Sequence, residues 1–278
     1  MTDKLTSDLI GDPNIWRMAM LISDDALDVV AYSTVEDNSM LYRHIPLDTA
    51  AADRVKALEE VVYENPLLLA GFDKVWCVVR TRRFFTLPQA VASDDVLTAE
   101  ITSAVWPAGG SPGFTAITNH LEGLDTSIVM EIPRPLAGFL RRTFDNPPIL
   151  HHLTPLCRYF HGKGRLGNSG RMYAHFHKGQ VDIISFSRST VALANSYRYR
   201  DPMDAIYYIM ACRNMAGLDP MADELFLCGD TAVREEATPQ LREYLAYVMP
   251  VIFPSAVFKT GKNALSAPFY LTILPLCE

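Results

Sequence analysis

The residues of this sequence best suited to hold a metal are five histidines in its middle part. His175 and His177 stand two positions apart, so on a strand both would point to one face. His151, His152 and His161 precede them, and imidazole nitrogens are common zinc ligands. The pair adjoins a turn, however, and no acidic residue or cysteine pair extends the motif. We therefore expect structural histidines and no metal site.

Residues 162–167 read Gly-Lys-Gly-Arg-Leu-Gly and match the pattern G-x-G-x-x-G. A dinucleotide-binding loop of this kind follows a strand and opens a helix. Here an aromatic-rich segment of helical character precedes the glycines, and a strand pattern follows them. We interpret residues 162–170 as a flexible junction between two halves of the chain.

Nucleophilic catalysis has no support in the sequence. There is no G-x-S-x-G elbow, and no cysteine has an obvious basic neighbour. The cysteines are odd in number and form no C-x-x-C pair, and most have apolar neighbours, which is typical of buried thiols in a reducing cytosol. The five are Cys77, Cys157, Cys212, Cys228 and Cys277.

Composition sets the broad class. Of the 278 residues, 49% are hydrophobic and 21% charged, which is typical of a globular protein. The net charge of -7 disfavours binding to nucleic acid or to an anionic membrane surface. The N-terminal residues lack a signal-peptide core, and the apolar residues 244–258 are interrupted by Pro250 and Pro254. We expect a cytoplasmic protein without membrane insertion.

An aromatic and basic strip is the one candidate interaction surface in the sequence. It suits a protein interface, although a half-exposed strand followed by a helix face would have the same pattern. The strip contains Tyr197, Arg198, Tyr199, Arg200, Tyr207 and Tyr208.

The hydrophobic pattern predicts the same series of elements twice. In the first half, apolar runs predict strands at 15–22, 27–32, 40–45 and 75–79, with a helix between the last two. That helix has Ala52, Val55, Leu58 and Val62 on one face and ends at Asn65. Strands at 84–87 and 127–132 and a helix after Pro135 follow, whereas residues 90–125 have no clear pattern.

The second half begins with strands predicted at 171–176, 181–186 and 190–196. A helix capped by Asp201 follows, with Pro202 in its first turn and a stop at Gly217. A strand at 225–228 comes next, and Thr238 and Pro239 predict the start of another helix that turns Leu241, Leu245 and Val248 inward. We predict a last strand at 269–274.

The two halves can be aligned directly. Residues 17–33 align with residues 171–187 without a gap, which favours an internal duplication over two unrelated buried hairpins. We divide the chain into domains 1–166 and 167–278. The identical pairs are Arg17 with Arg171, Met18 with Met172, Asp28 with Asp182 and Ser33 with Ser187.

Two strand-strand-strand-helix-strand-helix units, each opened by a hairpin, resemble the actin-like ATPase superfold. The chain is most similar to an uncharacterised bacterial family with a degenerate actin-like fold, related to pilus-assembly ATPase-like proteins. The resemblance implies an α/β fold of duplicated actin-like (ribonuclease H-like) domains, each a mixed sheet opened by an antiparallel hairpin and flanked by helices. It covers most of the chain and is carried by residues 85–88, 129–133, 194–199, 204–208 and 225–230.

The resemblance also implies where a nucleotide would bind. Superfold members hold ATP between the domains, with glycine and aspartate in each hairpin turn contacting phosphate and Mg²⁺. Here the first turn has Asp24 and Asp25 but no glycine, and the second has Lys178 and Gly179 but no aspartate. In the adenosine loop Gly229 fits the pattern, whereas the residue after it is Asp230 in place of a second glycine.

These eroded loops lead to two hypotheses. We favour a non-catalytic actin-like protein, a pseudo-ATPase that acts through an unknown protein partner or through self-association and needs no cofactor. The alternative is a divergent ATP-binding protein, either an ATPase or a phosphotransferase. It would use Asp24 or Asp25 for Mg²⁺, Lys178 and Gly179 for phosphate, and Gly229 beside the adenosine.

Overall fold

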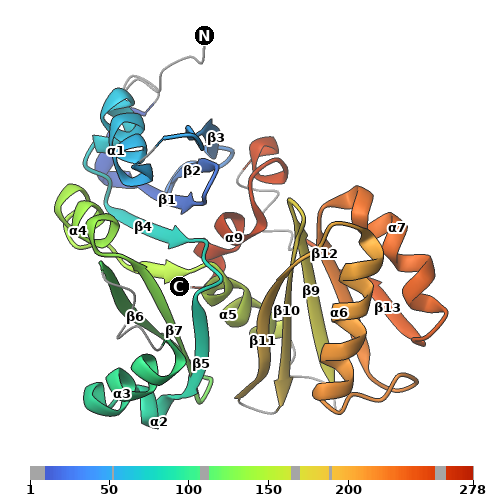
Figure 1. Ribbon diagram of the computed structural model, residues 1–278. Helices are drawn as coiled ribbons and strands as arrows, with labels where there is room; N and C mark the ends of the chain where they lie inside the picture. The colour runs from blue at the N-terminus through green and yellow to red at the C-terminus, as the bar shows by residue number, and fades with distance from the viewer. Residues whose placement is uncertain are drawn as a thin grey trace.

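The computed structural model describes residues 10–51, 53–106, 113–163, 170–187, 190–253 and 261–277. Two five-stranded mixed sheets dominate the molecule, one in each half of the chain, with helices between and outside them (Figure 1). The predicted boundary between residues 166 and 167 falls in 164–169, outside the described residues.

The first sheet has the strand order β3-β2-β1-β4-β8. Strand β1 pairs antiparallel with β2 and parallel with β4, so the sheet is mixed. Nearly every residue of β1 and β2 is buried, which explains why these strands are continuous apolar runs without alternation. The strands are β1 (Trp16–Ile22), β2 (Ala26–Ser33), β3 (Leu41–Pro46), β4 (Lys74–Val79) and β8 (Ile149–His151).

The second sheet repeats this arrangement in the order β11-β10-β9-β12-β13. Strand β9 pairs antiparallel with β10 and parallel with β12. The strands are β9 (Arg171–His177), β10 (Gln180–Ser187), β11 (Thr190–Arg198), β12 (Glu224–Gly229) and β13 (Tyr247–Pro250).

The hairpin registers support the duplication. Met18 pairs with Ala31 in the first hairpin, and Met172 pairs with Ser185 in the second. Both partners are displaced along the chain by the same number of residues. The ungapped alignment of the sequence therefore corresponds to one hairpin geometry built twice.

A small antiparallel sheet of order β5-β7-β6 extends from the first half. It includes part of the region without a clear pattern, because residues 90–125 contain two helices and strand β6. Asp94 caps the second of these helices by accepting from the amides of Val96 and Leu97. The elements are β5 (Phe84–Pro88), α2 (Gln89–Ala92), α3 (Asp95–Val105), β6 (Phe114–Leu121) and β7 (Thr126–Pro133).

Three hydrophobic clusters set the layers of the molecule. One packs α1 and α4 against the outer face of the first sheet, and another packs α6 and α7 against the outer face of the second. The third fills the space between the sheets with residues of both halves, including α5 (Figure 1). The helices are α1 (Arg54–Glu64), α4 (Arg134–Thr143), α5 (Leu153–Lys163), α6 (Pro202–Met215), α7 (Thr231–Arg242) and α9 (Phe269–Thr272).

The predicted last strand at 269–274 is wrong. Helix α9 and the 3₁₀ helix η5 (Leu274–Cys277) occupy these residues, between the two sheets (Figure 1). A short apolar run between two prolines does not distinguish a strand from a helix buried on all sides. Tyr270, Leu271 and Ile273 have no exposed surface, so this segment is part of the core that joins the halves.

The predicted start of the last long helix is also wrong. Helix α7 begins eight residues earlier than Pro239, where Asp230 caps it by accepting from the amides of Ala232 and Val233. Pro239 lies inside the helix, and Val248 belongs to β13. The aspartate cap therefore decides the boundary here, and the proline does not.

The other predicted elements are present with small shifts at their ends. Helix α6 begins as expected, because Asp201 and Asp204 form a capping box after which Pro202 is the first residue. Ala52, expected on the face of α1, lies outside the described residues. Three further 3₁₀ helices are η2 (Pro13–Ile15), η3 (Pro66–Leu69) and η4 (Lys262–Leu265).

Candidate functional site

The tips of the two opening hairpins meet each other. The duplication places Asp24 and Asp25 in the first turn at the positions of Lys178 and Gly179 in the second. The Lys178 ammonium lies 3.0 Å from the Asp25 carboxylate, and about half of each side chain is exposed. Burial alone would raise the pKa of Asp25, but the bond from Lys178 and a second from Ser23 hold that pKa below its ordinary value. The two halves are thus joined by an ion pair between equivalent turns.

The two turns differ in backbone conformation. Lys178 and Gly179 have φ angles of 42° and 71°, the left-handed pair that a type I′ hairpin turn requires. Asp24 and Asp25 have no such positive φ. The geometry of a tight turn accounts for Gly179 without a ligand.

Gly229 does not join this group. It has a φ of 89°, and a Cβ atom built on it would lie 1.9 Å from the carbonyl oxygen of Phe176. The close approach of β12 to β9 therefore requires glycine at this position. The next residue, Asp230, is occupied as the cap of α7.

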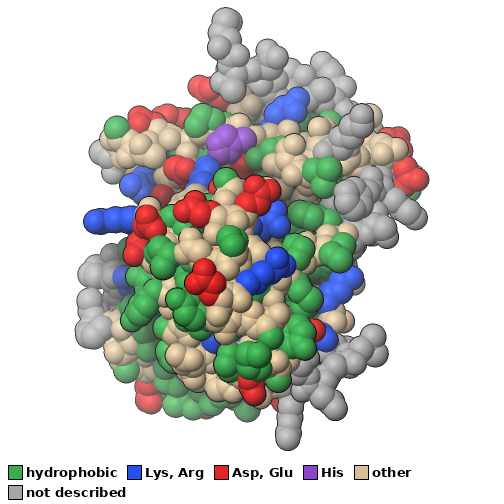
Figure 2. All heavy atoms as spheres, turned by 90° about the vertical axis from the view of Figure 1, so that its right-hand side faces the viewer, with side chains coloured by type: hydrophobic (Ala, Val, Ile, Leu, Met, Phe, Trp, Pro, Cys, Tyr) green, Lys and Arg blue, Asp and Glu red, His purple; other side chains and the backbone are tan. Residues whose placement is uncertain are grey.

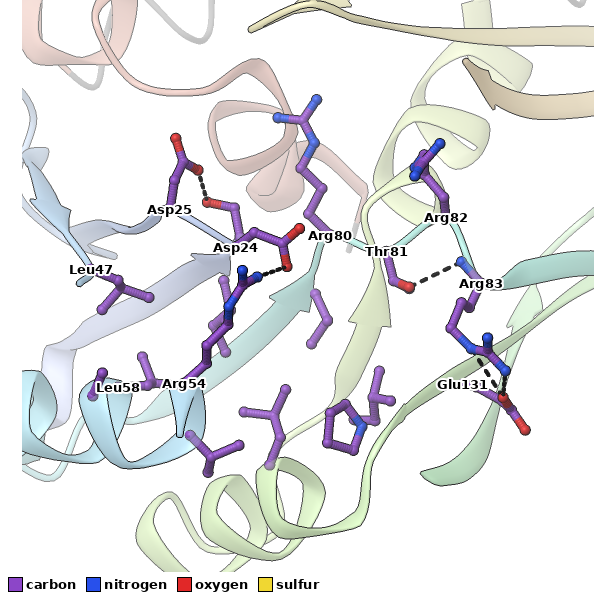
Figure 3. A pocket seen from close by; sticks show the side chains of 18 of the residues that line it. Asp24, Asp25, Leu47, Arg54, Leu58, Arg80, Thr81, Arg82, Arg83 and Glu131 are labelled. Carbon is purple, nitrogen blue, oxygen red and sulfur yellow. Dashed lines mark hydrogen bonds and ion pairs between the residues drawn. The ribbon is translucent and has the colours of Figure 1, made fainter. Parts of the chain in front are cut away.

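A cavity of about 650 Å³ lies beside the two turns. It opens at the carboxyl ends of the parallel strands β1 and β4, where open α/β sheets usually bind ligands. Asp24, Asp25, Lys178 and Gly179 all line it, whereas Gly229 does not. Figure 3 shows the cavity between α1, the end of β4 and the start of α4.

The cavity is rich in charge. Arg54 and Arg198 lie 3.2 and 3.9 Å from the Asp24 carboxylate, and the Arg83 guanidinium lies 2.5 Å from the buried Glu131. Figure 3 shows Arg83 turned towards Glu131 and away from Arg80 and Arg82. Six basic residues face four acidic ones in the lining, namely Arg54, Arg80, Arg82, Arg83, Lys178 and Arg198 against Asp24, Asp25, Asp48 and Glu131.

Arg80, Arg82 and Arg83 are absent from the set of site residues expected from the sequence. Arg80, Arg82 and Arg83 directly follow the buried strand β4. Because β4 runs parallel to β1, this basic run lies next to the first hairpin turn. Three arginines at the carboxyl end of a predicted central strand were the signal that could have identified them.

A buried polar cluster forms a second constellation between the sheets. Asp182 on β10 accepts hydrogen bonds from the hydroxyls of Ser196 and Tyr270 and lies 3.3 Å from Nε2 of His152. His175 lies 3.7 Å from the other carboxylate oxygen. All five side chains are buried. Three of them come from the second sheet, Tyr270 comes from α9, and His152 lies directly after β8 of the first sheet.

The charges of this cluster shift its pKa values in predictable directions. Burial would raise the pKa of Asp182, but His152 and the bond from His175 hold it well below the ordinary value. Burial lowers the pKa of His175, and it holds the pKa of the neighbouring His151 well below its ordinary value. Burial and the Asp182 charge raise the pKa of Tyr270. The cluster is therefore built for an ionised aspartate among hydrogen-bond donors.

The fold brings four of the five histidines considered as zinc ligands into neighbouring positions and leaves His161 apart, and His175 and His177 stack with centroids 6.3 Å apart. His152 and His175 share Asp182, the ring of His151 lies tilted against that of His152 with a centroid distance of 4.2 Å, and His161 contacts Phe186. His177 offers its carbonyl oxygen to Arg80 at 3.3 Å. Within the described ranges, no three His, Cys, Asp or Glu side chains are arranged to hold a metal ion.

The cysteines and the glycine motif noted in the sequence are the remaining candidates, and those of their residues that the structure describes have structural positions. Cys77, Cys157 and Cys228 are buried, and burial raises the pKa of each thiol, which disfavours the reactive thiolate. Of the glycine motif, Gly162 lies near the end of α5, and residues 164–169 are outside the described residues.

The aromatic strip is partly exposed. Tyr197 and Tyr208 stack with their ring centroids 4.4 Å apart, and Tyr207 beside them is 68% exposed. On the same helix, α6, the side chains of Met203 and Met215 are also more than half exposed. Figure 2, which faces the α6, α7 and β13 side, shows hydrophobic side chains at this surface with charged ones between them.

In the part of the chain that the structure describes, no helix has the length and apolar character needed to span a membrane.

Comparison with known proteins identifies the fold. The model of a family described as "Protein of unknown function (DUF3822)" matches residues 15–248. A Bacteroides thetaiotaomicron protein with actin-like ATPase fold and unknown function matches with a TM-score of 0.77 and 22% identity, over 94% of this chain and 96% of that one. The predicted actin-like fold is confirmed. Among curated proteins, no relative matches the chain.

Two further solved structures resemble the chain more distantly. One is in the PilM-PilN type IV pilus biogenesis complex, with a TM-score of 0.47, 11% identity and coverage of 94% of this chain and 98% of that one. The other is ethanolamine utilization protein EutJ from Carboxydothermus hydrogenoformans, with a TM-score of 0.45, 10% identity and coverage of 98% and 95%.

Proposed function

Because the chain belongs to the family described as "Protein of unknown function (DUF3822)" and has the actin-like ATPase fold, we propose that it is a non-catalytic actin-like protein. It acts by binding a protein partner or a second copy of itself. The observation that carries this proposal is the ion pair between Asp25 and Lys178. It ties together the two turns that would have to face the phosphates of a nucleotide.

The other loop features support the same proposal. The first turn lacks the glycine that would let its amides approach a phosphate. Gly229 is used for packing against Phe176, and Asp230 caps a helix. A structural role thus accounts for each residue that an adenosine loop would need.

An exposed apolar surface supports the binding of a protein. Met203, Tyr207 and Met215 on α6 are each more than half exposed, and aromatic residues and methionine are enriched in protein interfaces. We expect self-association or partner binding to cover this face of α6. We also place the protein in the cytoplasm, where Cys77, Cys157, Cys212 and Cys228 can stay reduced as buried free thiols.

A divergent ATP-binding protein is the second candidate. It is favoured by one observation, namely that Asp24, Asp25, Lys178 and Gly179 line a single cavity. In that case a bound nucleotide would have to displace Lys178 from Asp25.

Thermal unfolding with and without millimolar Mg-ATP separates the two candidates. A ligand at a hundred times its Kd stabilises a protein by about 2.7 kcal/mol, which is a clear rise in Tm. We expect no rise for the wild type or for Asp25→Asn, in which the ion pair is opened. A rise that disappears in an Asp24→Ala, Asp25→Ala double variant would contradict the proposal and establish nucleotide binding.

The interface is tested by sedimentation equilibrium over a wide concentration range. Tyr207→Ser removes the most exposed aromatic ring of the strip, and Val96→Ser on α3 is a control of similar exposure. Self-association predicts a dimer that Tyr207→Ser weakens and Val96→Ser does not. A monomer at every concentration would exclude self-association and leave a foreign partner.

A further inference from the structure

One wall of the cavity beside the hairpin turns is apolar and comes entirely from the first half of the chain. Leu58 and Leu136 are nearly buried on α1 and α4, whereas Leu47, Val55 and Pro133 are only half-buried at the opening. In ligand sites of this kind the apolar wall usually contacts the body of the ligand, and a few polar groups of the protein bind its polar end. The cavity volume of about 650 Å³ suits a small molecule.

Two arginines after the end of β4 also line the cavity and offer positive charge, and the charge of Arg80 additionally acts on the buried carboxylate of Asp182. Among the described residues, Arg82 has no hydrogen bond or ion pair. Arg80 gives one Nη to a carbonyl oxygen, but its buried Nε has no hydrogen-bond partner within the described part of the chain. A buried donor without an acceptor is costly, so an anionic acceptor at this point would be stabilised.

The start of α4 adds to this positive field. Its first residue follows Pro133 at the cavity wall, no side chain caps the helix, and its first turn contains no acidic residue. The amide of Arg134 donates to the carbonyl oxygen of Gly113, but no carboxylate in the first turn compensates the positive end of the helix dipole. In contrast, the positive end of α1 is compensated by the carboxylate of Asp53.

The local charge is opposite to that of the whole protein. The chain carries a net charge of -7, yet basic residues outnumber acidic ones in the lining by six to four. Three of the four acids are already paired, with Arg54, Lys178 and Arg83. An added anion would thus meet the guanidinium groups of Arg80 and Arg82 and few free carboxylates.

We propose that this cavity binds a small amphipathic anion, a molecule with an apolar body and one carboxylate or phosphate group. Its body lies against Val55, Leu58 and Leu136, and its anionic group lies at Arg80 and Arg82. A nucleotide fits this chemistry less well, because its base and sugar are polar and Gly229 is absent from the lining.

Isothermal titration calorimetry with matched probes tests the proposal. Octanoate and octyl phosphate carry both parts of the expected ligand, whereas inorganic phosphate has only the head and octanol only the body. All are used well below micelle-forming concentrations. We expect saturable binding of octanoate or octyl phosphate and at least tenfold weaker binding of octanol and inorganic phosphate. The tighter of the two anions identifies the head group.

Three variants locate the site. Arg82→Gln removes the exposed unpaired charge, Val55→Glu places a negative charge in the apolar wall, and Arg141→Gln removes an exposed charge of α4 that does not line the cavity. The first two should weaken binding at least tenfold, and the third should leave it unchanged. If Val55→Glu fails to fold, Arg82→Gln decides alone.

No saturable binding by either anion, or binding that Arg82→Gln leaves unchanged, would overturn the proposal. Equal affinity for inorganic phosphate would also overturn it, since the apolar wall would then contribute nothing. The result is independent of the Mg-ATP and sedimentation experiments, because neither of these measures binding at Arg82.

Discussion

Asp28 and Asp182 occupy the same position in the second strand of the two hairpins, and both carboxylates are buried. Each accepts a hydrogen bond from a tyrosine hydroxyl, Asp28 from Tyr42 and Asp182 from Tyr270. The partners have separate origins, since Tyr42 is on the edge strand β3 and Tyr270 is on α9. The duplication thus keeps the aspartate and changes what surrounds it.

The two tyrosines should differ in their contribution to stability. Tyr270 is fully buried and Tyr42 is half-buried, so water can replace the hydroxyl of Tyr42 more easily. We expect Tyr270→Phe to lower the free energy of unfolding by about 1.5–3 kcal/mol and Tyr42→Phe by about 1 kcal/mol or less. Urea denaturation of both variants measures the difference. Equal losses would mean that burial does not decide the strength of these bonds.

Gly229→Ala should be far more harmful than an alanine at another glycine of positive φ. The added Cβ would lie 1.9 Å from the backbone of Phe176, and neither strand can yield without breaking its pairing. Gly123, with a φ of 74° and no neighbour within 4 Å, is the matched control for backbone strain alone. We expect a loss of about 1 kcal/mol for Gly123→Ala and more than about 3 kcal/mol for Gly229→Ala.

The readout for these two glycines is urea denaturation, or the yield of soluble protein if Gly229→Ala does not fold. A Gly229→Ala variant as stable as Gly123→Ala would show that β12 and β9 can separate at this point. It would also reopen an adenosine-loop role for Gly229, because the packing argument against that role would be lost.

The ion pair between the turns should contribute little to stability. About half of each side chain is exposed, and exposed pairs contribute about 0.2–1 kcal/mol. A double-mutant cycle with Asp25→Asn and Lys178→Met should give a coupling energy in that range, which decreases in 1 M NaCl. A coupling well above this range would instead mean that the pair determines how the two halves pack.

The elements that the sequence predicts well are those whose signals are local. The two hairpins follow from buried apolar runs, and α6 follows from Asp201, Pro202 and Asp204, which cap the helix with their own side chains. For the C-terminal segment around Tyr270 the sequence wrongly predicts a strand. Its helical form is set by the two sheets that enclose it. No local pattern contains that information.

The same limit applies to the candidate site. Asp24, Asp25, Lys178 and Gly179 could be identified because the superfold resemblance marks hairpin turns. Arg54 reaches Asp24 from α1 within the first half, and Arg198 reaches it from β11 of the second half, so both contacts follow only from tertiary packing. Of the cluster at Asp182, the sequence marks Asp182 as an identity in the internal alignment and His152 and His175 as candidate ligands, but it does not indicate that they meet.

Stability should fall as the pH is lowered below about 6.5. Burial holds the pKa values of His151 and His175 below the ordinary value near 6.5, so the unfolded chain binds protons that the folded protein does not. The free energy of unfolding should therefore be highest above this pH and decrease as pH falls towards the folded-state pKa values. Asp182 adds a further loss only in more acidic solution, below its unfolded pKa near 4.

Urea denaturation at pH 7.5, 6.5 and 5.5 measures this slope. His151→Asn removes one of the two groups and should make the decrease shallower, whatever its effect on stability at pH 7.5. His120→Gln, at an exposed position on β6 outside the buried cluster, is the matched histidine control. A wild-type stability that is constant from pH 7.5 to 5.5 would contradict the prediction, because it would require these buried imidazoles to bind protons as readily as in the unfolded chain.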